Sequence, residues 1–143
     1  MLHEMSQELA ERLSRLAQHF GLHLIVQFGS TVAGPTHARS DLDLAVQLTG
    51  PDLSLRRVLD IQAALADLFP GQDVDLAILN RADPLFLKKI TEQCRLLYGA
   101  PQDLALLRLS AFKRYQDFRP YLEIERRFVS RRLASLTAES RAS

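Results

Sequence analysis

The strongest constraint on the fold is a short segment, residues 41–46, in which Asp41, Asp43 and Ala45 alternate with larger apolar residues. Successive side chains of a β-strand point to opposite faces, so this alternation predicts a strand with one buried face. Asp41 and Asp43 then share the other face, where their carboxylates repel each other. Because such repulsion does not favour folding, the spacing points to a function, and a hard cation such as Mg²⁺ takes carboxylate oxygens as ligands.

The residues before this strand supply an anion-binding turn. A mostly apolar run, residues 22–28, has the character of a strand and ends at Gly29 and Ser30. Glycine allows a tight turn and a close approach to a ligand. Backbone N–H groups at such a turn, with the serine hydroxyl, can bind phosphate oxygens. Farther along, residues 73–79 alternate again and carry Asp75 near their start, so the pattern predicts a triphosphate and metal site.

This combination resembles the nucleotidyltransferase superfamily that includes DNA polymerase beta, whose signature is glycine-serine, a spacer, Asp-x-Asp and a third acid on a later strand. The resemblance implies that Gly29 and Ser30 bind the triphosphate. It implies a catalytic and metal-binding set of Asp41, Asp43 and Asp75 with Mg²⁺ as cofactor. In that family a nucleophile attacks the α-phosphorus in line and pyrophosphate leaves. Asp75 either completes the metal site or acts as general base.

Length and the C-terminal sequence narrow the resemblance. A chain of 143 residues is one domain, too small for the additions of polymerases and tRNA-processing members. Residues 115–123, with the run Asp-Phe-Arg-Pro-Tyr-Leu, are typical of the MntA group, antitoxins paired with HEPN-domain toxins. The resemblance implies a protein adenylyltransferase that moves AMP from ATP to a tyrosine hydroxyl of a cognate HEPN ribonuclease and neutralises it. A hetero-oligomer with the toxin is implied as well.

Two other functions stay open at this point. Relatives often carry arginines just after glycine-serine, whereas residues 29–34 contain no positive charge, which favours an antitoxin that only binds its toxin. The same motif also serves antibiotic nucleotidyltransferases, although these usually add a second domain or a dimer partner. Arg39, Arg81, Lys88 and Lys89 are the candidates for neutralising a triphosphate.

Strands and helices alternate along the chain. Leucine spacing predicts helices over residues 4–20 and 53–69, and Asp83-Pro84 predicts the start of a third that ends at residue 92. The predicted fold class is α/β, a small mixed sheet of the nucleotidyltransferase fold flanked by helices. We divide the chain into a core (1–100), a C-terminal helical extension packing on it (101–137) and a flexible tail (138–143). Pro120 predicts two helices or one bent helix in the extension.

Composition limits the partners. No run approaches the ~20 apolar residues that span a membrane, and no signal-peptide pattern opens the chain, so we expect a cytoplasmic protein. The net charge is only +1, and the arginines of residues 126–132 fit a solvated helix face. We therefore do not expect direct binding to nucleic acid.

Overall fold

The computed structural model describes residues 5–29 and 41–142, in which helices and strands are interspersed along the chain. The helices are α1 (Gln7–Phe20), α2 (Leu55–Leu68), the short 3₁₀ helix η1 (Leu79–Arg81), α3 (Pro84–Glu92) and α4 (Pro101–Ala142). The strands are β1 (Leu22–Phe28), β2 (Asp41–Leu48), β3 (Asp73–Ile78) and β4 (Cys94–Tyr98). The predicted α/β class is confirmed.

The strands of the described residues form one sheet in the order β3-β2-β1-β4. β1 runs antiparallel to β2 and β4, whereas β2 and β3 run parallel, so the sheet is mixed, as predicted. A parallel pair needs a crossover connection, and α2 lies in it. As a result, the C-terminal end of β1 meets the N-terminal ends of β2 and β3 at one end of the sheet.

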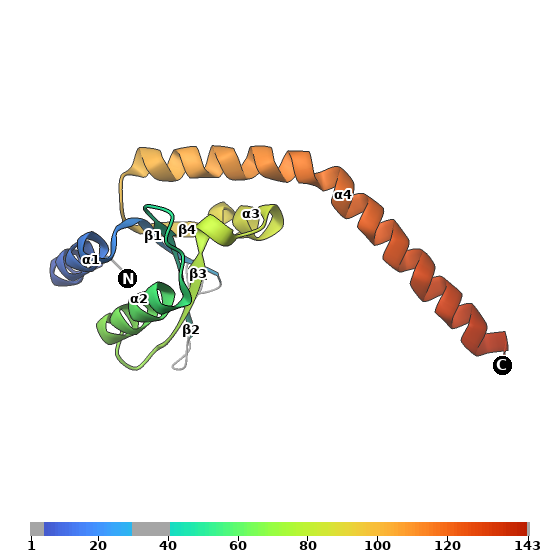
Figure 1. Ribbon diagram of the computed structural model, residues 1–143, viewed down its shortest axis with the longest axis horizontal. Coiled ribbons are helices and arrows are strands. Elements are labelled where there is room, and N and C mark those ends of the chain that lie inside the picture. Colours follow the sequence, from blue (N-terminus) through green and yellow to red (C-terminus); the bar gives the residue numbers. More distant parts are fainter. Residues whose placement is uncertain (1–4, 30–40, 143) are drawn as a thin grey trace.

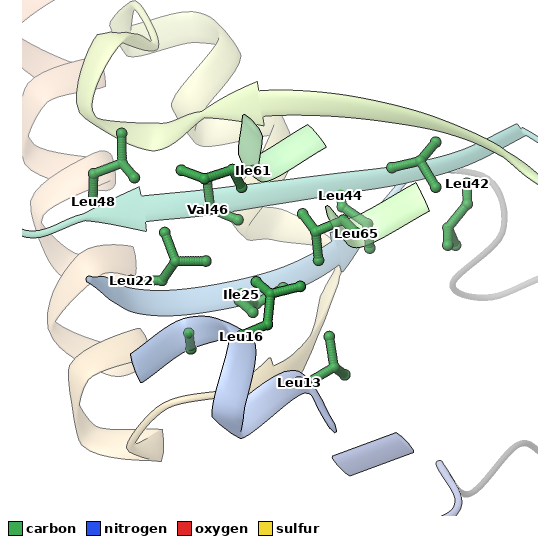
Figure 2. Close-up of a cluster of buried hydrophobic side chains, with 12 residues drawn as sticks. Leu13, Leu16, Leu22, Ile25, Leu42, Leu44, Val46, Leu48, Ile61 and Leu65 are labelled. Atoms are coloured by element: carbon green, nitrogen blue, oxygen red, sulfur yellow. The ribbon is translucent and has the colours of Figure 1, made fainter. Parts of the chain in front are cut away.

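Two apolar cores lie on opposite faces of the sheet. α1 and α2 cover one face, and α3 with the first half of α4 lies on the other (Figure 1). On the first face, leucines of β2 pack against both covering helices (Figure 2); the labelled side chains include Leu13, Leu16, Leu42, Leu44, Val46, Ile61 and Leu65. The second core contains Ala45. Because successive side chains of a strand point to opposite faces, Asp43 lies on the same face as Ala45, the face covered by α3.

Local signals set the helix ends. α1 begins at Gln7, later than predicted, because the Ser6 hydroxyl accepts a hydrogen bond from the Leu9 amide and forms its N-cap. It ends at Gly21, which adopts the left-handed conformation (φ 69°). Asp83 caps α3 by accepting from the Phe86 amide, as predicted.

Arg57 connects two loops by hydrogen bonds at the end of the sheet opposite the acids. Its guanidinium donates to the carbonyl oxygens of Phe20 (2.8 Å), Gly21 (3.3 Å), Thr49 (3.2 Å) and Asp52 (2.5 Å). These carbonyls belong to the α1–β1 and β2–α2 connections. One side chain therefore joins the C-terminus of α1 to the start of α2.

α4 is one long bent helix (Figure 1). Pro120 lies inside it and has no N–H to donate to the carbonyl of Gln116, which accounts for the bend. Of the two predicted arrangements, one bent helix is confirmed. Residues 138–142, which we assigned to a flexible tail, continue the helix, since no glycine or proline stops it. α4 is long but rich in charge, and no helix in the described ranges is apolar enough to cross a membrane.

Candidate active site

Aspartates face one another across the two parallel strands. Asp41 is in register with Asp73, and Asp43 with Asp75. Register partners point to the same face of a sheet, so all four carboxylates lie at one end of the face that α3 covers. The structure thus brings the three predicted acids together. It also places Asp73 beside them. The sequence indicates this residue too, because Asp73 lies two residues before Asp75 in the same alternating segment.

Asp43 has the most perturbed environment of these acids. It is half-buried, whereas Asp41, Asp73 and Asp75 are exposed. Burial raises the pKa of the Asp43 carboxyl, and the negative charges of Asp75 and Asp41 raise it further. An acidic pair that repels itself in the folded protein gains from any cation placed between its members.

Gly29 follows β1 and brings the backbone against Asp43. Its φ is +82°, a conformation that residues with a side chain rarely adopt. A Cβ added there would lie 2.5 Å from the Oδ2 of Asp43, so no side chain fits without moving that carboxylate. The close approach explains why glycine stands beside the acids. Ser30, the other predicted triphosphate ligand, lies outside the described residues.

A cleft of about 550 Å³ opens beside the acidic pair. Asp43, Asp75 and Asp83 contribute its carboxylates, and its walls are largely apolar; the other lining residues are Phe28, Leu76, Ala77, Ile78, Arg81, Ala82 and Phe86. The rings of Phe28 and Phe86 meet edge to face, with centroids 6.0 Å apart. Phe86 is 40% exposed, so part of its ring is available to a ligand. We did not predict either phenylalanine, because β1 and α3 meet only in the folded chain.

The structure distinguishes the basic residues that we considered for neutralising the triphosphate. Arg81 lines the cleft, and its guanidinium donates to the Leu53 carbonyl. Lys88 instead pairs with Glu92, and its ammonium lies 4.8 Å from the centroid of the Tyr115 ring. Lys89 is exposed on α3 and is not among the residues that line the cleft. Arg39 falls outside the described residues.

The acids suit a hard divalent ion that shares its coordination with a substrate. Among residues 5–29 and 41–142, no three His, Cys, Asp or Glu side chains are grouped as a complete set of protein ligands. Mg²⁺ does not require one, because it is commonly held by one or two carboxylates, water and substrate phosphates. The paired carboxylates of Asp43 and Asp75, with Asp41 on the same face, fit such an ion.

Comparison with known proteins gives the same family from sequence and from structure. The model of the polymerase beta nucleotidyltransferase family matches residues 11–103, which contain the described acids and the whole cleft lining. The protein adenylyltransferase MntA of Shewanella oneidensis is 32% identical over 108 residues, which cover 76% of this chain and 73% of MntA.

Two solved structures superpose over most of the chain. One is a toxin–antitoxin complex with AMP-PNP, whose matching chain has a TM-score of 0.68 and 27% identity, with 87% of this chain and 98% of that chain covered. The other, a tri-AMPylated Shewanella oneidensis HEPN toxin in complex with MNT antitoxin, gives a TM-score of 0.64 and 25% identity over 91% and 99%. From the family match, the relative MntA and these structures, we conclude that the chain belongs to the polymerase beta nucleotidyltransferase family.

Proposed function

We propose that this chain is a Mg²⁺-dependent protein adenylyltransferase, an antitoxin that transfers AMP from ATP to a tyrosine hydroxyl of a cognate HEPN toxin in the cytoplasm. The observation that carries the proposal is the register of β2 and β3, which sets Asp43 beside Asp75 at the mouth of an apolar cleft. The relative MntA is a protein adenylyltransferase, and the superposed complex contains a tri-AMPylated HEPN toxin. Both support a protein substrate and AMP as the transferred group.

The cleft suits a nucleotide with its base inward and its phosphates at the acids. The apolar wall and the exposed part of Phe86 offer a surface on which a purine can pack. Gly29 and Ser30 donate backbone N–H groups to the triphosphate in this scheme. Of the basic candidates, Arg81 lines the cleft, and we assign it the role of neutralising the negative charge of the phosphates.

Asp41, Asp43 and Asp75 are the residues that would hold Mg²⁺. When bound, the ion supplies positive charge to the phosphate oxygens and to the departing pyrophosphate. Burial and the charges of Asp75 and Asp41 raise the pKa of the Asp43 carboxyl, and a cation beside it would favour its ionised form. The same repulsion that costs folding free energy therefore serves to bind the cation.

The transfer forms one bond and breaks one. The tyrosine oxygen bonds to the α-phosphorus of ATP, the bond from that phosphorus to the bridging oxygen breaks, and pyrophosphate leaves. Asp75 lies on β3, an edge strand of the sheet, and is exposed, so a protein substrate can reach it. We assign Asp75 the role of general base, which accepts the proton of the tyrosine hydroxyl, in addition to helping to hold the cation.

Intact mass spectrometry of the HEPN toxin tests the proposal. A cognate HEPN toxin is incubated with the chain, ATP and Mg²⁺, and its mass should increase by one or more AMP units. Asp43→Asn should abolish the increase, whereas Asp52→Asn, which changes an exposed acid in the connection before α2 and outside the cleft, should retain it. Fragmentation then identifies the modified residue, and an adduct on an amino acid other than tyrosine would refute that part.

The same experiment separates the rival functions. A stable complex with no mass increase would favour an antitoxin that acts by binding alone. Absence of both complex and adduct, with pyrophosphate released only when an aminoglycoside or lincosamide is added, would favour an antibiotic nucleotidyltransferase.

A further inference from the structure

The second half of α4 carries an apolar face that no part of the described chain covers. Beyond Pro120 the helix extends away from the sheet and the other helices (Figure 1). Six large apolar side chains in this half are between 47% and 69% exposed: Tyr121, Ile124, Phe128, Val129, Leu133 and Leu136. They recur at steps of three and four residues, or of one, so they lie on one side of the helix.

Two opposite charges lie in the middle of this face. Glu125 and Arg132 are seven residues apart, or two helical turns, and flank Phe128 and Val129. An apolar partner surface would bury both charges without a counter-charge, which is costly. The face therefore fits a partner that offers an arginine opposite Glu125 and an acid opposite Arg132.

The order of residues supplies that partner, because the face is complementary to itself when the helix is reversed. About the point between Phe128 and Val129, Glu125 exchanges with Arg132 and Tyr121 exchanges with Leu136. Ile124 exchanges with Leu133 by the same reversal. A two-fold axis through that point would set two antiparallel helices together with apolar residues against apolar residues. Glu125 of each copy would then face Arg132 of the other.

We propose that this face, residues 121–136 of α4, is a docking surface for a second copy of the chain, which binds antiparallel about Phe128 and Val129. The reciprocal Glu125–Arg132 pairs fix the register and orientation, as polar residues do in helix pairs generally. The contact spans sixteen residues, about 24 Å of helix. A surface of this length falls in the class of small, weak interfaces, so we expect a dissociation constant of roughly 10–100 μM.

Charge reversal tests the pairing directly. Sedimentation equilibrium on the full chain, from about 5 to 500 μM, should show a monomer–dimer equilibrium for the wild type. Glu125→Arg sets arginine against arginine twice, and Arg132→Glu sets acid against acid twice. Each single variant should weaken dimerisation by about tenfold or more. The double variant, and an equimolar mixture of the two single variants, should restore it, because both arrangements recover two opposite-charge pairs.

The controls distinguish a lost contact from a lost fold. Both residues are exposed on the helix surface, so circular dichroism should report unchanged helicity in every variant. A wild type that stays monomeric throughout the range would overturn the proposal. So would a double variant or mixture no better than the single variants. Single variants that dimerise normally but no longer bind the HEPN toxin would assign this face to the toxin instead.

Discussion

Replacing Asp43 by asparagine should stabilise the fold while abolishing transfer. The pKa of this carboxyl is raised above its ordinary value of 3.8 by burial and by the charges of Asp75 and Asp41. A raised native pKa means that the folded state binds the proton more tightly than the unfolded state does. Stability from this group is therefore full below pH 3.8 and is lost as the pH rises through the folded value. At neutral pH the ionised Asp43 opposes folding, and asparagine removes that opposition.

The size of the effect follows from the register of the sheet. Like charges placed opposite each other on neighbouring strands each cost roughly 0.2–1 kcal/mol. Asp43 has one such neighbour, Asp75, and a second acid, Asp41, on its own strand. We expect Asp43→Asn to raise the free energy of unfolding by about 0.5–1 kcal/mol at pH 7, equivalent to about 2–4 °C in Tm.

Urea unfolding without divalent cations, from pH 3 to 8, measures the effect. The stability curves of wild type and variant should converge at the acidic end and separate as the pH rises. Asp52→Asn is the control of opposite sign, because hydrogen bonds from Ser54 lower the pKa of Asp52 and its ionised form favours folding. Added Mg²⁺ should stabilise the wild type and have little effect on Asp43→Asn. A variant less stable than wild type at pH 7 would refute the reasoning.

Three further substitutions probe other contacts. Gly29→Ala should lose most transfer activity and about 1–2 kcal/mol or more of stability. Gly71→Ala is the control: Gly71 also has a φ of +82°, but a Cβ there meets open space, so this variant should lose stability alone. Equal transfer activity in the two variants would contradict the account. Arg81→Ala should raise KM for ATP about tenfold in steady-state kinetics, and an unchanged KM, as expected for Lys89→Ala, would exclude Arg81 from the triphosphate. Arg57→Ala should lower the unfolding free energy by about 1.5–3 kcal/mol in urea, while its exposed neighbour Arg56→Ala should change it by less than about 0.5 kcal/mol; similar values for both would show that the carbonyl contacts contribute little.

The sequence predicted the elements well where short-range chemistry determines them. The alternation around Asp41 and Asp43 identified β2 and the face that its acids share. Gly21 ended α1, and Asp83 with Pro84 started α3, because caps and helix starts depend on a few neighbouring residues. The mixed sheet followed from the order of strands and helices together with the family resemblance.

Features that depend on distant residues could not be read from local patterns. The register that sets Asp43 opposite Asp75, and the contact of Phe28 with Phe86, arise only when the strands and α3 pack together. Arg81 was one of four equivalent basic candidates until the cleft separated it from Lys88, which pairs with Glu92. How the chain divides into a core and an extension stays a prediction.

The source of the transferred group tests the central claim most directly. The chain is incubated with Mg²⁺ and its HEPN toxin, using ATP labelled in one sample at the α-phosphate and in another at the γ-phosphate. The acidic pair and the cleft predict that the toxin acquires label only from the α-position, that pyrophosphate appears in equal amount, and that Asp43→Asn acquires none. Label from the γ-position would make the reaction phosphorylation, and no label on a toxin that nevertheless binds would contradict transfer altogether.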